Sequence, residues 1–243
     1  MMHDVLTVFW KEGKEILEMN GPRGGFIRLL IWFGVFGVFL PLELGEAWLS
    51  SPAALLLWVW FPIFVVANTT AGTVAGEREH HTLETLLASR LPDRAVLFGK
   101  VWAAVAYGWL LTLGSIVMGV ITVNLVMPGA FRFPAPLLAA GGPLLSLLAA
   151  ITAAGIGVHV SLYAPTVRQA QQTLSLATLL LFLVPTFGAQ ALPSGMRARL
   201  AAAVSDLPAG RAVVAAAFVL AFLDAILLAA AAARFRRERL ILD

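Results

Sequence analysis

Long runs of apolar residues, separated by short groups of charged and turn residues, dominate the chain. A helix needs about 20 mostly apolar residues to cross a bilayer, because the hydrocarbon core is about 30 Å thick and each residue adds about 1.5 Å. Six runs meet this requirement, at about residues 26–45, 53–72, 97–125, 137–162, 173–191 and 211–233. We therefore predict an all-α integral membrane protein with six transmembrane helices in one domain, residues 1–243.

The first run is the weakest of the six. Only residues 29–42 lie between Arg28 and Glu43, and so short a charge-free run is also typical of a re-entrant or buried helix. Arg28 can extend its guanidinium to the interface, and Trp32 and Trp48 lie near the two ends of the run, where interfacial aromatic residues are common. We interpret this run as a span.

Residues 1–22 precede the first run and show a different pattern. Within residues 3–19, apolar and charged positions fall on opposite faces of a helix. This pattern predicts an amphipathic helix in the plane of the membrane interface, before Gly21 and Pro22 turn the chain toward the first span. The alternative is a solvated amphipathic helix packed on a partner. The apolar face would consist of Val5, Leu6, Phe9, Trp10, Gly13, Ile16 and Leu17.

The composition excludes a soluble enzyme. Apolar residues make up 60% of the chain and charged residues 13%, whereas soluble domains average about 45–50% and about 25%. A chain of this length cannot bury so many apolar side chains in one core. It also contains no Cys, which excludes disulfides, thiolate metal sites and cysteine nucleophiles.

The basic residues predict the orientation in the membrane. If both termini are cytoplasmic, thirteen of the 17 Lys and Arg residues fall in inner segments and four in outer segments, as the positive-inside rule requires. We therefore predict a multi-pass protein of the cytoplasmic membrane with both termini inside, including a basic tail at 234–243. The net charge of +3 reflects this asymmetry and does not indicate a nucleic-acid partner. The four outer residues are Arg132, Arg197, Arg199 and Arg211.

The longest cytoplasmic loop of this topology lies between the second and third runs. From Thr73 to Lys100 it reads TVAGEREHHTLETLLASRLPDRAVLFGK. Leucines at helical spacing form an apolar stripe, and charged residues lie beside it. We predict a short helix in the loop over 73–94, held between two membrane helices and suited to docking on a partner. The leucines are Leu83, Leu86, Leu87 and Leu91, and the charged group comprises Glu77, Arg78, Glu79, His80 and Glu84.

This loop resembles a known family. The patterns AGERE at 75–79 and TLETLLAS at 82–89, followed by Gly99 and Lys100, are similar to the intracellular loop of permeases from ABC transporters of the second exporter type, ABC-2. The resemblance implies that the loop forms a coupling helix, seated in a cleft of an ATP-hydrolysing subunit. It assigns this ATPase-coupling role to Glu77, Arg78, Glu79, Leu83, Glu84, Leu86 and Leu87.

The same resemblance implies the partners and the activity. The chain has no G-x-x-x-x-G-K-[ST] phosphate loop, so we expect no cofactor on it and expect ATP and Mg²⁺ on a separate ATPase. Family members work with two ATPase copies and two permease chains, identical or related, within membrane lipid. The expected function is outward translocation of a substrate, and the short outer loops leave no room for a receptor domain.

Three polar residues within the predicted spans are candidate intramembrane sites. Asp224 would cost about 2.5–3.5 kcal/mol to insert, so it needs a partner or a proton; cation or proton passage is one role, and a structural hydrogen bond to a neighbouring helix is the one we favour. His159 can sense pH or contact a substrate, although a packing role is commoner. Asn68 can bond to a helical carbonyl or line an entry path, and the sequence leaves both open.

Small residues at four-residue spacing in the fourth run allow close helix packing. They can pack helices within the chain, which we favour, or form the seam of a permease dimer. The two rows are Ala149, Ala153 and Gly157, and Ser146, Ala150 and Ala154.

A membrane-embedded enzyme and a non-transporting membrane anchor are the alternative functions. An enzyme would need a cluster of polar groups in the membrane, and we assign no catalytic residues. Glu77, His80, His81 and Glu84 have helical spacing, but they do not form H-E-x-x-H, so we interpret them as a solvated charged surface and expect no metal site. An anchor would have no need of the charged loop at 73–100.

Overall fold

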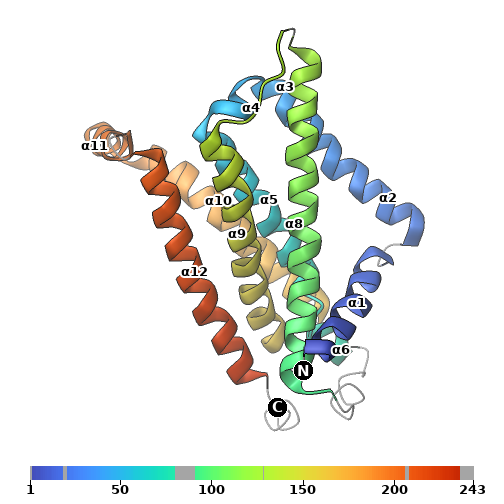
Figure 1. Ribbon diagram of the computed structural model, residues 1–243. Coiled ribbons are helices and arrows are strands. Elements are labelled where there is room, and N and C mark those ends of the chain that lie inside the picture. The colour runs from blue at the N-terminus through green and yellow to red at the C-terminus, as the bar shows by residue number, and fades with distance from the viewer. Residues whose placement is uncertain (1, 19–20, 80–90, 128, 206–207, 236–243) are drawn as a thin grey trace.

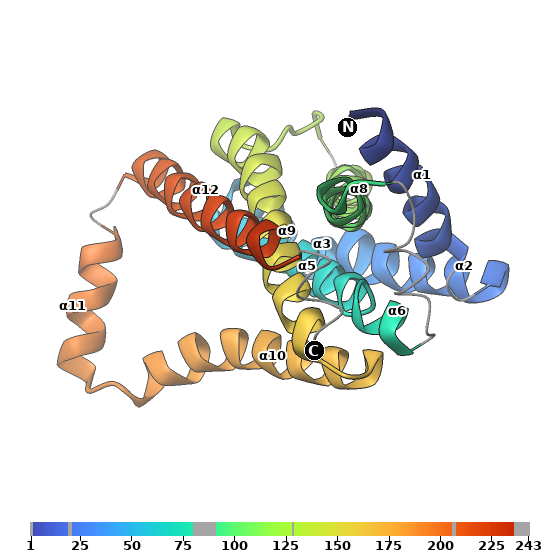
Figure 2. The same ribbon diagram turned by 90° about the horizontal axis from the view of Figure 1, so that it is seen from below.

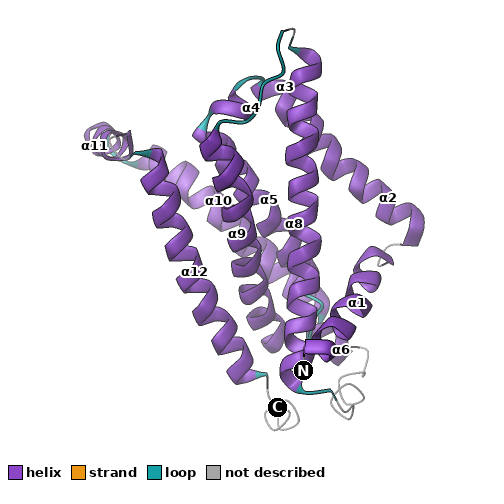
Figure 3. Ribbon diagram, viewed as in Figure 1, coloured by secondary structure: helices purple, strands orange, loops and turns teal. Residues whose placement is uncertain are grey.

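The computed structural model of the chain describes residues 2–18, 21–79, 91–127, 129–205 and 208–235 (Figure 1). Regular secondary structure in these residues is helical throughout (Figure 3), which confirms the all-α prediction. In chain order the helices are α1 (Met2–Glu18), α2 (Gly21–Trp32), the π-helix η1 (Phe33–Phe39), α3 (Leu40–Leu44), α4 (Ala47–Ser50), α5 (Pro52–Thr70), α6 (Ala75–Glu79), α8 (Asp93–Val126), α9 (Pro136–Tyr163), α10 (Val167–Ala191), α11 (Ser194–Ser205) and α12 (Ala209–Arg234).

Five segments of the described residues are long and apolar enough to cross a membrane. They match the first, second, third, fourth and sixth predicted runs, so a multi-pass membrane protein is confirmed. The fifth run, 173–191, lies within helix α10, which is not among the five, and the count of six spans therefore stays a prediction. The five segments are Gly24–Leu44, Pro52–Glu79, Asp93–Val126, Pro136–Tyr163 and Ala209–Arg234.

Helix α10 nevertheless carries the chain from one end of the bundle to the other. At the end of α9, Ser161 accepts hydrogen bonds from the backbone N–H groups of Val74 and Ala75, just before and within α6. At the opposite end, Val213 near the start of α12 lies against Gly141 near the start of α9. Figure 1 shows α10 rising between these ends, and Figure 2 shows it strongly tilted relative to α8. Consequently α1, α6 and the C-terminal end of α12 share one end of the molecule.

The first span is continuous through α2, η1 and α3. Within η1 the carbonyl oxygen of Gly37 accepts a hydrogen bond of 2.8 Å from the Thr122 hydroxyl on α8. A Cβ at Gly37 would lie 3.0 Å from the Met118 Cβ, so the two helices are in close contact there. The rings of Phe36 and Phe61 stack with centroids 4.3 Å apart, which attaches the same span to α5. The weakest run in the sequence is therefore held by packing on both neighbours.

Helix α1 occupies the segment with the amphipathic pattern. Its Val8 is buried against α8, where a Cβ added to Gly99 would lie 2.5 Å from the Val8 Cβ. Leu6, Trp10 and Leu17 are more than half exposed. One side of α1 thus packs on the same chain and other apolar side chains point outward. Its location in the membrane interface stays a prediction.

Helices α5 and α9 form the centre of the bundle (Figure 2). Gly157 on α9 faces the buried Thr70 on α5, and Gly142 faces Trp58, with no room for a Cβ at either glycine. The neighbouring small residues of α9 are all buried. Both small-residue rows therefore lie in contacts within the chain, as the favoured interpretation predicted. The buried members are Ser146, Ala149, Ala150, Ala153 and Ala154.

Replacing Gly157 with Ala is expected to lower the free energy of unfolding by about 1–3 kcal/mol, because the added methyl group must displace Thr70 inside a packed contact. The matched control is Gly188→Ala on α10, where no atom lies within 4 Å of the added Cβ. Unfolding of the purified protein in a detergent titration measures both variants. The packing argument would be contradicted if both variants lost the same free energy of unfolding, or if Gly157→Ala lost none.

Candidate functional site

The turn from α5 into α6 is attached to the end of α9 by one hydroxyl group. Ser161 is fully buried; its Oγ accepts from the N–H groups of Val74 and Ala75, at 3.0 and 2.9 Å, and donates to the Ala71 carbonyl at 3.0 Å. Backbone groups at a helix start and in a turn otherwise lack partners. Ser161 therefore determines how the loop leaves the bundle.

Arg78 and Glu79 connect α6 to α9 and α10. The Arg78 guanidinium donates to the Leu162 carbonyl at 3.2 Å and to the Ala164 carbonyl at 3.5 Å, where α9 ends. The Glu79 carboxylate accepts from the N–H of Val167 at 2.9 Å, the first residue of α10. A cation at a helix C-terminus and an anion at a helix N-terminus both interact favourably with the helix dipole. Both side chains thus make hydrogen bonds to backbone groups of the same chain.

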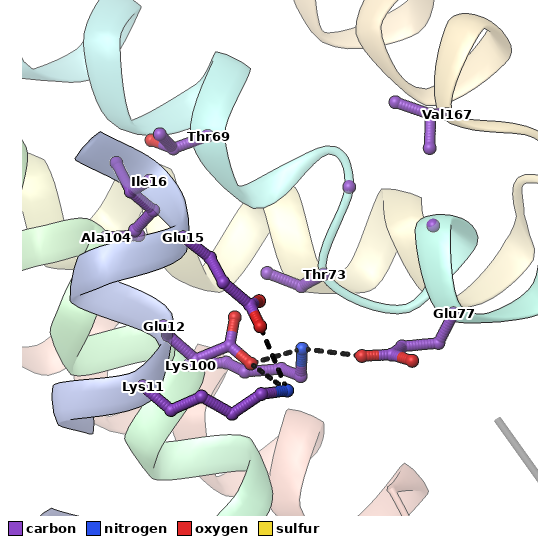
Figure 4. A pocket seen from close by; sticks show the side chains of 12 residues that line it. Lys11, Glu12, Glu15, Ile16, Thr69, Thr73, Glu77, Lys100, Ala104 and Val167 are labelled. Atoms are coloured by element: carbon purple, nitrogen blue, oxygen red, sulfur yellow. Dashed lines mark hydrogen bonds and ion pairs between the residues drawn. The ribbon is translucent and has the colours of Figure 1, made fainter. Parts of the chain in front are cut away.

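Glu77 belongs to a buried charge cluster (Figure 4). The Lys100 Nζ lies 3.1 Å from Glu77 Oε1 on α6 and 2.7 Å from Glu12 Oε1 on α1. The Lys100 side chain is only 6% exposed, and the two carboxylates are 17% and 12% exposed. An ammonium group this well buried is costly unless it is paired and hydrogen-bonded, and here two carboxylates share that task. The cluster joins α1, α6 and α8.

A cavity of about 550 Å³ opens beside this cluster. It lies between α1 and the turn from α5 to α6, and its walls carry charged and hydroxyl side chains (Figure 4). Lys11, at its rim, pairs with Glu15 at 3.2 Å, and both are more than half exposed. The contact between α1 and the loop is therefore polar and open, unlike the packed contacts of the spans.

The site is a loop anchored to four helices at one end of a membrane bundle. A family model described as ABC-2 type transporter matches residues 5–193, from α1 to the start of the segment after α10. The chain belongs to the ABC-2 type transporter family. A comparison with curated proteins gave no match.

The site residues predicted for this ABC-2 permease divide into two groups. Glu77, Arg78 and Glu79 lie together on α6, and each one contacts a different helix of the same chain. Leu83, Glu84, Leu86 and Leu87 lie outside the described residues, as do His80 and His81. The ATPase-coupling role of all seven predicted residues stays a prediction. In the described part of the chain, no group of three or more His, Asp or Glu side chains is arranged for a metal.

Sequence reasoning missed Lys100, Glu12 and Ser161 as parts of the site. Lys100 entered only as a basic residue and as the last residue of the loop pattern, and Glu12 was assigned to neither face of the amphipathic helix. One signal was available: Lys100 lies within the third run, directly before its charge-free part from residue 101, where an unpaired ammonium would be costly. Ser161 is an ordinary residue of an apolar run, and no pattern distinguishes it.

The intramembrane polar residues of the permease are dispersed. Asp224 on α12 is 5% exposed and accepts a hydrogen bond from the Thr152 hydroxyl on α9. Its Oδ2 is buried without a partner among the described residues. His159 Nδ1 bonds to the Gly155 carbonyl at 2.8 Å, and Asn68 donates to the Phe64 carbonyl at 2.9 Å, each within its own helix. The bond from Thr152 to Asp224 is a bond between helices, as the structural role requires.

Replacing Asp224 with Asn is expected to leave insertion and unfolding near those of the parent, because the amide oxygen can still accept from Thr152. Asp224→Ala and Thr152→Val should show a coupling of about 0.6–1.7 kcal/mol in a double-mutant cycle, the range measured for such bonds in membranes. Detergent unfolding of the four proteins of the cycle supplies the numbers. Additive effects of the two substitutions would contradict a structural bond.

Proposed function

We propose that the chain is the permease subunit of an ABC exporter, which moves a substrate outward from the cytoplasm or the inner leaflet while a separate ATPase hydrolyses ATP. Membership of the ABC-2 family and the five apolar helices carry the transport function. The anchored α6 supports the coupling step, because a loop with directional bonds to α8, α9 and α10 can transmit a displacement to the bundle. ATP and Mg²⁺ would be bound by the partner.

The proposed complex contains two permease chains, identical or related, and two ATPase copies in the cell membrane. The end with α1 and α6 would face the cytoplasm, since it holds most of the Lys and Arg residues that the structure describes. The opposite end, with α3, α4 and α11, would face outward. A membrane enzyme and a non-transporting anchor are disfavoured, because the described polar residues of the spans are dispersed and α6, the described start of the charged loop, is bonded to α9 and α10.

A single Cys at either end tests this orientation, because the chain contains no native Cys. Lys14→Cys on α1 is expected to stay unlabelled by an impermeant maleimide added to intact cells. Phe133→Cys, 81% exposed at the opposite end, should react. Permeabilised cells provide the control in which both react. Labelling of position 14 in intact cells would show that the orientation is the opposite of the proposed one.

The coupling role is best tested at Glu84. Glu77 already pairs with Lys100 inside the chain, so its reversal to Lys would place two cations together within the permease. If Glu84 lies at a buried contact with the ATPase, Glu84→Lys is expected to weaken that contact by about 2–5 kcal/mol, because it leaves a partner charge unpaired or repelled. The amount of ATPase that co-purifies with the tagged permease from native membranes measures this loss.

The matched control for this charge reversal is Glu43→Lys, an exposed acid at the opposite end of the bundle. It should retain parental amounts of ATPase. If Glu84→Lys also co-purifies with the parental amount of ATPase, Glu84 is not part of the contact. Absence of any ATPase from the parent preparation would favour the anchor over the permease.

A further inference from the structure

Helix α1 packs on α8 through Val8, whereas its link to α6 is made through charge. Beside the Lys100 cluster, the cavity separates α1 from the turn between α5 and α6, so few side chains pack there. Glu12 on α1 and Glu77 on α6 both reach the same Nζ, from opposite sides (Figure 4). A displacement of α6 therefore changes the electrostatic attraction and the hydrogen bond between Lys100 and Glu12 on α1.

The other end of α1 is attached to the first span. The Arg28 guanidinium on α2 donates to the Ile16 carbonyl at 3.1 Å, near the C-terminus of α1, and also lies 5.3 Å from the ring centroid of Tyr107 on α8. Carbonyl groups at a helix C-terminus lack partners within the helix, and a guanidinium is well suited to them. A contiguous set of polar contacts thus leads from α6 through Lys100 to α1, and from α1 to α2.

Stability alone gives a poor account of the Lys100 cluster. Buried ion pairs often contribute little to stability compared with apolar residues of similar volume, because desolvation offsets the attraction. Their directional bonds do specify one relative position of the elements they join, and Lys100 joins three elements that are distant in sequence. Its position at the base of α8, next to the loop, makes it a positioning group rather than a part of the core.

We propose that Lys100 is a positioning residue that makes α1 part of the coupling apparatus. Displacement of α6 is transmitted through Glu77, Lys100 and Glu12 to α1, and through Arg28 to the first span. The loop would then act on the bundle by two routes, directly on α8, α9 and α10 and through α1 on α2. This inference rests on the proposed function, since it needs an ATPase to displace α6.

Spin labels test the inference directly. One label is placed at Lys14→Cys on α1 and the other at Leu125→Cys, which is 81% exposed at the far end of α8. Electron–electron double resonance gives the distance distribution in the purified complex, with and without Mg-ATP. When labelled permease is diluted with unlabelled chain, so that a complex holds one labelled copy, the parent is expected to show one narrow distribution that shifts when Mg-ATP is added.

Glu12→Gln and Lys100→Met are expected to broaden this distribution and to abolish the shift. Glu12→Gln is the decisive variant if Lys100→Met fails to fold, because Glu12 lies on α1, outside the spans. The matched control is Glu15→Gln, which makes the same change on α1 at the rim of the same cavity but in an exposed pair with Lys11. It should behave like the parent. A mere loss of stability would not abolish the ATP-dependent shift in variants that remain assembled.

The possible failures are distinguishable. If the parent complex assembles but Glu12→Gln keeps the ATP-dependent shift, the role of Lys100 is rejected and the proposed function stands. If the parent distance does not respond to Mg-ATP, α1 is not part of the coupling apparatus. If no ATPase co-purifies with the parent chain, the proposed function is rejected, and this inference with it.

Discussion

The close approach of α5 and α9 is the contact on which the rest of the bundle depends. In lipid there is little hydrophobic drive between helices, so they associate through van der Waals contact, and small residues allow the backbones to come close. Gly142 and Gly157 provide that closeness against Trp58 and Thr70. The apolar cluster around this contact also contains Val101 and Val105 of α8 and Ala231 of α12. The helices that hold the loop are therefore placed relative to one rigid pair.

Directional polar bonds are concentrated at the end of the bundle that carries α6. Apolar packing tolerates rotation of a helix more readily than a set of hydrogen bonds does, because hydrogen bonds weaken steeply when they are misaligned. Ser161, Arg78 and Glu79 each bond to backbone groups that no helix satisfies internally. Short segments without an apolar core of their own are oriented in this way. Five residues of α6 are thus held by the termini of much longer helices.

The last helices of the chain are attached less extensively. On α10, Leu181 and Val184 are more than half exposed, and on α12 Phe218 and Phe222 are about three-quarters exposed. Helix α12 is held mainly on one face, where Leu227 packs on Gly155 and Asp224 bonds to Thr152, both on α9. The outward apolar faces are suited to lipid and to the second permease chain of the proposed complex.

The sequence by itself determined the class of the protein, five of its apolar spans, the amphipathic segment before them and the loop motif that resembles the ABC-2 family. These properties are local, because bilayer thickness converts run length into a span and helical periodicity assigns faces without reference to other segments. Only the tertiary structure decided which groups meet. Lys100 pairs with Glu12, Glu79 accepts a hydrogen bond from the first N–H group of α10, and Asp224 accepts one from Thr152. Such pairs depend on the rotation, tilt and depth of whole helices, which the packing of small residues sets and which no single segment encodes.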